Sequence, residues 1–361
     1  MVKYSKDDMA VIWLDSFVGL EHKNKVAILE QADYPAQVIE NLSKFCTFIT
    51  KITSESLYNN IYSALNENYI NSILFNLEKK NIKVITKFST DFPQELIETP
   101  ACPIILYCMG NTNLLKSDNK FSIVGSRKTI PIAIKSTEDI ARQLSENNFT
   151  IVTGLAEGGD TAAIKGALPS GNIISVLAYG FDYVYPEFNR NLLKQITEKG
   201  LVITEHTPDT APLGFMFPIR NRIIAGLSKA TLIISGGERS GTYYTADYAV
   251  EYNRDLFAFP YSIGVSSGAM CNAFIKKGAI LTESVLDIAV HYGINFEENK
   301  NKQDLTDTEL KCYNIIKGNE MHLNDIMKIS GLKIYEIMPI LSSLEIKKMI
   351  IKSGANIYSA R

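Results

Sequence analysis

The chain has 361 residues, of which 46% are hydrophobic and 21% are charged, a composition typical of a globular protein with two or three domains of roughly 100–200 residues each. Its formal net charge is −2, so any affinity for nucleic acid has to come from cations that are concentrated in one place. No run of about 18 uncharged apolar residues is present, and Asp7 and Asp8 follow closely on the start, so we expect no membrane span, no secretory signal and a cytoplasmic location.

Residues 1–80 predict a small helical domain. Apolar residues recur there at helical spacing, for example at Val11, Leu14 and Val18. The helices expected toward its end are 61–66 and 70–80.

Residues 81–294 predict a doubly wound α/β domain. A proline-rich stretch at 92–103 is expected to be irregular, because proline removes a backbone donor and restrains its neighbours. Apolar runs of strand length alternate with helical stretches along the rest, which indicates a mainly parallel sheet covered on both faces. The expected strands are 82–85, 104–108, 121–124, 150–152, 173–177, 201–203, 231–234 and 256–259. The expected helices between the later strands are 131–147, 187–199 and 241–253.

Residues 303–361 predict a third, smaller domain after a polar linker at 294–305. Three helices followed by two short strands are the pattern of a winged helix. The expected helices are 306–317, 322–329 and 333–346, and the expected strands are 349–352 and 356–358. The helix 333–346, with Lys347, Lys348 and Lys352, is a candidate for contact with duplex DNA, although Pro339 lies within it. A protein-contact domain with a solvated basic edge is an equally good interpretation.

The first candidate site follows the strand 121–124. In a doubly wound sheet, ligands bind beyond the carboxyl ends of the strands, where helix N-termini favour anions. Gly125 allows close backbone approach, Ser126 can donate a hydrogen bond, and Arg127 can neutralise a phosphate. The alternative is an ordinary turn with a solvent-exposed arginine. The pattern is not GxGxxG, so no dinucleotide cofactor is expected.

The second candidate follows the strand 150–152. Gly154 and the glycines after it extend the same rim of the predicted sheet. Asp160 is predicted to cap the next helix rather than to take part in catalysis. Glu157 does not suit a phosphate site and is expected to point away from it.

The third candidate is Phe217 with Arg220, Asn221 and Arg222. Guanidinium groups hold phosphates, and an aromatic ring can stack on an unpaired base, so this combination suits single-stranded nucleic acid. The alternative is that Phe217 belongs to the core and that one arginine is structural.

The fourth candidate is the segment from Gly236 through Glu238 and Arg239 to Thr242. Within it, Ser240, Gly241 and Thr242 are predicted to open a helix as an anion nest.

Signals for catalysis and for metal binding are weak. Glu205 and His206 could form an acid–base pair, but structural hydrogen bonds are the preferred interpretation. We identify no nucleophile–base pair, no HExxH and no P-loop. The five cysteines are scattered, which favours reduced thiols over a disulfide framework or a zinc site. We therefore expect no metal, no cofactor and no catalytic residue.

Taken in order, these blocks resemble the DprA/Smf family of DNA-processing proteins. The most specific stretch runs from Phe217 to Ser228 (Phe-Pro-Ile-Arg-Asn-Arg-Ile-Ile-Ala-Gly-Leu-Ser), and the similarity extends over about 90–290. The resemblance implies an extended Rossmann-like fold, often with a SAM-like helical domain before it and a winged helix after it. It also implies binding of single-stranded DNA, self-association into dimers, and contact with the RecA recombinase, which the family helps onto single strands during DNA uptake and natural transformation.

Several positions depart from the family pattern. The family usually has Arg at Glu157, Ile at Gly159 and His at Ile164. It usually has Glu-Ala at Ser235-Gly236 and Gly at Tyr261. Loss of a His and a Glu weakens a catalytic interpretation more than a binding one.

Two other functions remain as alternatives. One is a nucleotide-sensing regulator whose winged helix reads duplex DNA. The other is a nucleoside-monophosphate glycosidase, because the segment Gly236–Thr242 is faintly similar to the PGGxGT string of that class. Thr245 and Ala246, however, stand where a catalytic Glu is expected.

Overall fold

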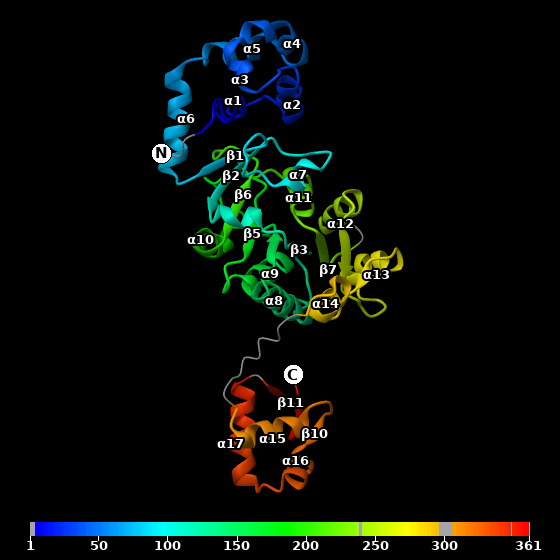
Figure 1. Cartoon of the computed structure of the whole chain (residues 1–361). Helices are drawn as coiled ribbons and strands as arrows, with labels where there is room; N and C mark the ends of the chain where they lie inside the picture. Colours follow the sequence, from blue (N-terminus) through cyan, green and yellow to red (C-terminus); the bar gives the residue numbers. More distant parts are fainter. Residues whose placement is uncertain (1–3, 238–239, 296–304, 348, 361) are drawn as a thin grey trace. The chain divides into compact units, whose positions relative to one another are not determined.

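The computed structural model of the chain describes residues 4–237, 240–295, 305–347 and 349–360. It divides into two compact units, Met1–Phe296 and Glu297–Arg361, which are described separately (Figure 1). The linker expected at 294–305 lies almost wholly outside the described residues.

The first unit is built on a nine-stranded sheet with the order β1-β2-β6-β5-β4-β3-β7-β8-β9. β1 pairs antiparallel with β2 and β2 with β6, whereas all the other pairs are parallel. The strands are β1 Lys83–Thr86, β2 Ile105–Gly110, β3 Lys120–Gly125, β4 Thr150–Thr153, β5 Ile173–Val176, β6 Leu201–Thr204, β7 Ala230–Ser235, β8 Asp255–Ala258 and β9 Ile280–Leu281. The expectation of a large, mainly parallel sheet is confirmed.

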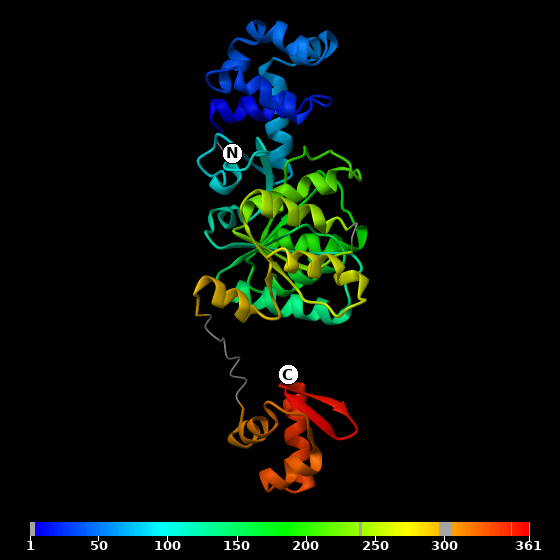
Figure 2. The same ribbon diagram turned by 90° about the vertical axis from the view of Figure 1, so that its right-hand side faces the viewer.

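Helices cover both faces of this sheet (Figures 1 and 2). Successive residues of β3 point to opposite faces of the sheet. Ile123 packs with α8, α9 and α10 on one face, whereas Val124 packs with α11 on the other. The first group of helices comprises α8 Pro131–Glu146, α9 Gly159–Ala167, α10 Arg190–Lys199 and α14 Val285–Tyr292. The second comprises α7 Gln94–Ile97, α11 Met216–Leu227, α12 Thr242–Glu251 and α13 Ala269–Lys276.

The strand order reverses between β3 and β7. From β3 the chain continues through β4, β5 and β6 on one side, and from β7 it continues through β8 and β9 on the other. A crevice outside the carboxyl ends of the strands at such a reversal is the usual ligand site of doubly wound sheets. The fold therefore directs attention to the loops after β3, β4, β5 and β7.

The N-terminal helices belong to the same compact unit as the sheet. Trp13 and Ile28 share one core cluster with Val84 and Ile105 of the first two strands. The helices are α1 Lys6–Asp15, α2 His22–Glu30, α3 Ala36–Glu40, α4 Cys46–Ile52, α5 Glu55–Ser63 and α6 Glu67–Lys79. The boundary at residue 80 and the SAM-like assignment stay predictions.

The helix expected at 61–66 is wrong in its bounds, because α5 begins at Glu55 and ends at Ser63. The Ser54 hydroxyl caps its start by accepting from the Leu57 N–H at 3.2 Å. Asn66, in turn, caps α6 by accepting from the Tyr69 N–H at 2.8 Å. Ser and Asn are preferred at helix starts, and these two capping signals fix the break between the helices.

The second unit contains three helices and a three-stranded antiparallel sheet with the order β10-β12-β11. Its elements are α15 Asp307–Ile316, β10 Met321–His322, α16 Leu323–Ser330, α17 Ile334–Ile346, β11 Ile350–Gly354 and β12 Ile357–Ala360. The three helices and the two later strands match the expected ranges closely, and β10 is an additional strand. The winged-helix assignment of this unit stays a prediction.

Candidate functional site

The loops after β3 and β7 are joined at the point where the strand order reverses. The Ser126 N–H donates to the Ser235 carbonyl at 3.2 Å and to the Ser235 hydroxyl at 3.0 Å. The hydroxyls of Thr129 and Ser235 lie 2.5 Å apart. Ser126 is therefore half-buried in a polar network between two loops, while the next residue, Arg127, is exposed.

The loops after β3 and β4 are held together by the buried carboxylate of Asp160. It accepts from the backbone N–H groups of Gly125 at 3.3 Å, Gly154 at 3.1 Å and Ala156 at 3.3 Å. Burial raises the pKa of this carboxyl above its ordinary value, although Arg220 and the three N–H groups favour the charged form. The predicted helix cap is thus wrong, because all three donors belong to the preceding loops and none to α9.

Gly125 allows a close approach between these loops, as expected, but its neighbour is protein. A Cβ on Gly125 would lie 2.4 Å from the Ile234 side chain, and a Cβ on Gly159 would lie 2.6 Å from the Gly125 Cα. The space that Gly125 leaves is filled by β7 and by the start of α9.

Arg220 is buried and faces the carboxyl ends of β4 and β5. Its Nη1 donates to the Gly154 carbonyl at 2.7 Å and also to the Val176 carbonyl. A Cβ on Gly154 would lie 2.6 Å from the guanidinium. The expectation that Arg220 contacts a phosphate is therefore corrected, because its guanidinium binds backbone carbonyls. Gly154 leaves room for that guanidinium, and its contact with DNA stays a prediction.

Arg222 is also buried, and it forms an ion pair with Glu205 at 2.5 Å. The opposite charge of Arg222 lowers the pKa of the Glu205 carboxyl against the opposing effect of burial. The structural role preferred for Glu205 agrees with this pair. Because the Arg222 side chain is buried and paired inside the protein, the expectation that its guanidinium holds a DNA phosphate is also corrected.

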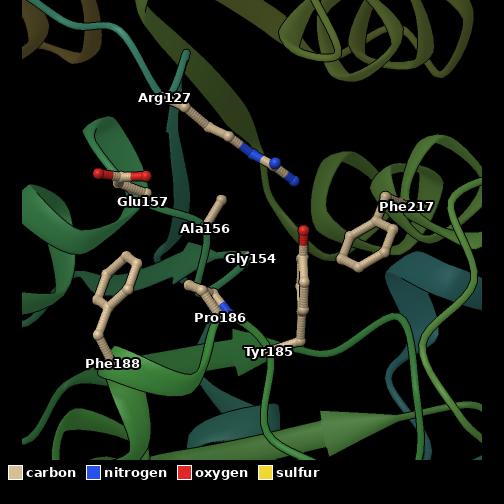
Figure 3. A pocket seen from close by; sticks show the side chains of 8 residues that line it. All are labelled: Arg127, Gly154, Ala156, Glu157, Tyr185, Pro186, Phe188 and Phe217. Carbon is tan, nitrogen blue, oxygen red and sulfur yellow. The ribbon is translucent and has the colours of Figure 1, made fainter.

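A pocket of about 220 Å³ lies where the segments after β3, β4 and β5 meet the start of α11 (Figure 3). We call it the aromatic pocket. It is lined by Arg127, Gly154, Ala156, Glu157, Tyr185, Pro186, Phe188 and Phe217. Of the predicted site residues, Arg127, Gly154 and Phe217 line it.

Aromatic rings and one guanidinium dominate this pocket. The Arg127 guanidinium lies 5.8 Å from the centre of the Tyr185 ring, within the range of a cation–π contact. The centres of the Tyr185 and Phe217 rings are 5.4 Å apart with an angle of 58° between the planes. The Tyr179 hydroxyl holds the Tyr185 backbone by donating to its carbonyl at 2.7 Å and accepting from its N–H at 2.9 Å.

Tyr185, Pro186 and Phe188 line the pocket but are assigned no role in the sequence analysis. The sequence nevertheless contains a signal for this part of the pocket. The segment after β5 has four aromatic residues close together: Phe181, Tyr183, Tyr185 and Phe188. Phe188 is 64% exposed. Several exposed aromatic residues in one strand-end loop indicate a binding surface rather than a core.

The predicted anion nest at the start of α12 is satisfied locally. The Thr242 N–H donates to the Ser240 hydroxyl at 3.3 Å, and the Ser240 hydroxyl donates to the Thr242 hydroxyl at 3.0 Å. The Asn221 side-chain amide donates to the Gly241 carbonyl at 3.2 Å. Asn221 thus connects α11 to this loop, and neither it nor the nest lines the aromatic pocket. Glu238 and Arg239 lie outside the described residues.

Among the described residues, no cluster of His, Cys, Asp and Glu could hold a metal ion. All five cysteines are free thiols. Within the same residues, no helix combines the length and the hydropathy that a membrane crossing requires.

Comparison with known proteins identifies relatives of the sheet-containing unit. A family model described as DNA recombination-mediator protein A matches residues 83–293. Protein Smf of Synechocystis sp. is 39% identical over 215 residues, which is 58% of this chain and 54% of that protein. DNA processing protein DprA of Streptococcus pneumoniae is 41% identical over 204 residues, which is 56% of this chain and 71% of that protein. The match thus spans about half the length of the Synechocystis protein.

Two solved structures are also similar. The X-ray structure of DNA processing protein A from Streptococcus pneumoniae has a TM-score of 0.66 at 31% identity, and the match covers 82% of this chain and 100% of that one. The structure of DNA processing protein A from Helicobacter pylori, described for its single-stranded DNA binding mode, has a TM-score of 0.54 at 28% identity. That match covers 59% of this chain and 97% of the other.

Proposed function

The chain belongs to the DNA recombination-mediator protein A (DprA/Smf) family, and from this membership we propose that it binds single-stranded DNA at the aromatic pocket. It acts as a binding protein rather than as an enzyme. The observation that carries the proposal is the placement of Arg127 beside Tyr185 and Phe217 at the carboxyl edge of the sheet.

These three side chains supply the two interactions that unpaired DNA needs. The exposed Arg127 offers a guanidinium to a phosphate, and a base can stack on an aromatic ring for about 1–3 kcal/mol. The bases of a duplex are already stacked on one another, so they are not free to stack on these aromatic rings. The Helicobacter pylori relative, whose structure is described for binding single-stranded DNA, supports this assignment.

Buried residues of the site support the loops. Arg220 binds the carbonyls after β4 and β5, and Asp160 binds N–H groups after β3 and β4. Both therefore act as positioning residues, while Arg127 is the proposed phosphate contact. Ser126, Asn221, Ser240, Gly241 and Thr242 remain proposed contacts for the flanking strand.

The wider role follows from the family. We propose that the protein forms homodimers, protects incoming single strands and helps load RecA during DNA uptake and natural transformation. The direct test is RecA filament formation on single strands coated with a single-strand binding protein, with and without this protein. No acceleration of filament formation would remove the loading role and leave DNA binding untouched.

Arg127→Ala tests the binding site itself. Loss of one charged phosphate contact is expected to weaken single-strand binding by about 1–2 kcal/mol, roughly 5- to 30-fold. It should also reduce the slope of log affinity against log salt by about 0.7, the value for one phosphate on a single strand. Fluorescence anisotropy with a labelled oligonucleotide at several salt concentrations measures both.

Lys128→Ala is the matched control. Lys128 is an exposed cation next to Arg127 in the chain, but it does not line the aromatic pocket. An equal loss of affinity in the two variants would show that general positive charge, and not the pocket, attracts the DNA.

Neither alternative function gains support from the described residues. Thr245 and Ala246 are buried in α12, where the glycosidase comparison requires a catalytic carboxylate. The helix α17, which a duplex-reading regulator would use, contains no Lys or Arg between Ile334 and Ile346.

A further inference from the structure

The aromatic pocket contains a charge that DNA binding alone does not explain. Glu157 lines the aromatic pocket together with Arg127, so the two charged side chains of the pocket have opposite signs. The Glu157 side chain is exposed, and within the described part of the chain neither an ion pair nor a hydrogen bond occupies its carboxylate. A carboxylate repels phosphate, so we expect the phosphate at the Arg127 end of the pocket and a hydrogen-bond donor beside Glu157.

The two charges lie at different ends of the pocket. Figure 3 shows the Arg127 guanidinium directed toward Tyr185 and Phe217, and Glu157 on the side of Phe188. Pro186 lies between Phe188 and Tyr185, so one aromatic side chain stands on each side of it. The space between them has apolar walls, a carboxylate at one end and a cation at the other.

This arrangement matches one nucleotide of a single strand. A planar base can lie over Pro186 with Phe188 and Tyr185 on either side of it, and the phosphate attached to it reaches the cation. The volume of about 220 Å³ is below the roughly 300–1,000 Å³ of pockets that enclose drug-sized ligands, which suits a single base. The carboxylate then meets the edge of that base and accepts hydrogen bonds from it.

We propose that Glu157 makes the aromatic pocket selective for bases that present an exocyclic amino group. The proposal rests on the proposed DNA binding and adds the class of base that the site prefers. A carboxylate only accepts hydrogen bonds, and the cytosine N4 amino group is a donor that Asp and Glu side chains recognise. Uracil and thymine present the O4 carbonyl at the same position, which repels the carboxylate, and their one donor on that edge, N3–H, lies between two carbonyl groups.

Phe188 is the second determinant of this selectivity. It is 64% exposed and provides the wall on the Glu157 side, so it holds the base edge near the carboxylate. Removing its ring should weaken binding of every strand and also reduce the preference, because the base is then free to turn away from Glu157.

The test compares two strands of equal length, oligo-deoxycytidine and oligo-deoxyuridine. Their bases differ in the N4 amino group against O4 and in the proton on N3. Binding is measured by anisotropy at slightly alkaline pH, so that cytosine stays neutral. The wild-type protein is expected to bind the cytosine strand roughly 3- to 10-fold more tightly, a modest effect for one base contact at an open rim.

Glu157→Gln is the deciding variant, because it keeps the shape and can donate as well as accept. It should bind the two strands equally, whereas Lys128→Ala should keep the wild-type preference. Equal binding by the wild-type protein, or a preference that persists in Glu157→Gln, overturns the base selectivity while leaving DNA binding intact. No salt-dependent binding of either strand overturns the proposed function and the selectivity together.

Discussion

Arg220 and Arg222 lie two residues apart on α11, yet neither reaches the aromatic pocket. Arg220 donates to two strand-end carbonyls, and Arg222 pairs with Glu205. A guanidinium recognises carbonyl oxygens, carboxylates and phosphates with the same N–H groups. The residue types therefore indicated an oxygen-rich environment correctly, but they could not show that the oxygens belong to the protein.

Arg127 differs because of its position in the chain. It follows a buried strand and precedes a helix that begins at Pro131, so it lies on a strand-end loop. Such loops lie at the edge of the sheet, where ligands bind. The sequence could predict this site residue because topology alone exposes it.

Gly154→Ala tests whether Arg220 organises the site. The added Cβ would lie 2.6 Å from the guanidinium, so the arginine or the loop has to move. We expect the free energy of unfolding to fall by about 1–3 kcal/mol, as for other overpacked sites, and single-strand binding to weaken as Phe217 shifts with α11. Chemical denaturation followed by circular dichroism measures the first effect, and anisotropy the second.

Gly241→Ala is the control for that variant. Nothing lies within 4 Å of a Cβ at Gly241, and its backbone has a right-handed helical conformation. It should change the stability by less than about 1 kcal/mol. A Gly154→Ala protein as stable as Gly241→Ala would contradict the positioning role of Arg220.

Among the elements, strands and long helices were predicted best. Near-continuous apolar runs mark strands that are buried on both faces, and β3 to β8 all fall at or near the expected ranges. The elements missed or misplaced are short: α5, α7, α14, β9 and β10. The starts of α5 and α14 depend on single side-chain contacts, such as Ser54 to Leu57, which a pattern of hydrophobicity does not contain.

The side chains of α17 bear on whether the C-terminal unit contacts duplex DNA or another protein. Its exposed side chains include Ile334, Tyr335 and Met338, with Glu336 among them. A helix that reads duplex DNA needs cations for the phosphates beside it. The apolar and acidic side chains of this face suit contact with a protein, and the flanking Lys333 is an exposed cation at the start of the helix, so both interpretations stay predictions.

The C-terminal unit should lose stability at low pH through Glu309. This side chain accepts from the Ser343 hydroxyl at 2.5 Å and from Lys347 at 2.8 Å, and these bonds lower its pKa from 4.5 to about 2. A lowered folded-state pKa contributes stability that is complete above about 4.5 and is lost as the pH falls toward 2.

Hydrogen exchange of α15 measures this effect. Protection of its backbone amides, corrected for the intrinsic exchange rate, should fall in the wild-type protein across that pH window. In Glu309→Gln it should be lower at neutral pH and change less on acidification. Equal pH dependence in the two proteins would show that other groups control the acid sensitivity of the unit.

For the whole molecule, the charge is nearly balanced. The chain has 37 Lys and Arg against 39 Asp and Glu, and two of the arginines predicted for the site are used inside the protein. The proposed affinity for DNA would therefore rest on a few contacts at one edge of the sheet. We expect a shallow salt dependence, since each phosphate contact contributes only about 0.7 to the slope on single strands.

The family match and the candidate site lie in the same part of the chain. The matched residues 83–293 contain all nine strands of the large sheet and the whole aromatic pocket. The sequence could predict this region and one of its cations. It could not predict that Tyr185 and Phe188, which follow β5, line the same pocket as Phe217 of α11, because these two segments meet only in the folded structure.

Cross-linking with mass spectrometry tests the central claim most directly. A single strand carrying photoreactive 5-iodocytosine is bound to the full-length protein and irradiated, and the attached peptides are sequenced. We predict cross-links to the segments that contain Tyr185, Phe188 and Phe217, and their loss in Arg127→Ala but not in Lys128→Ala. Cross-links confined to α17 or to the N-terminal helices would contradict single-strand binding at the aromatic pocket.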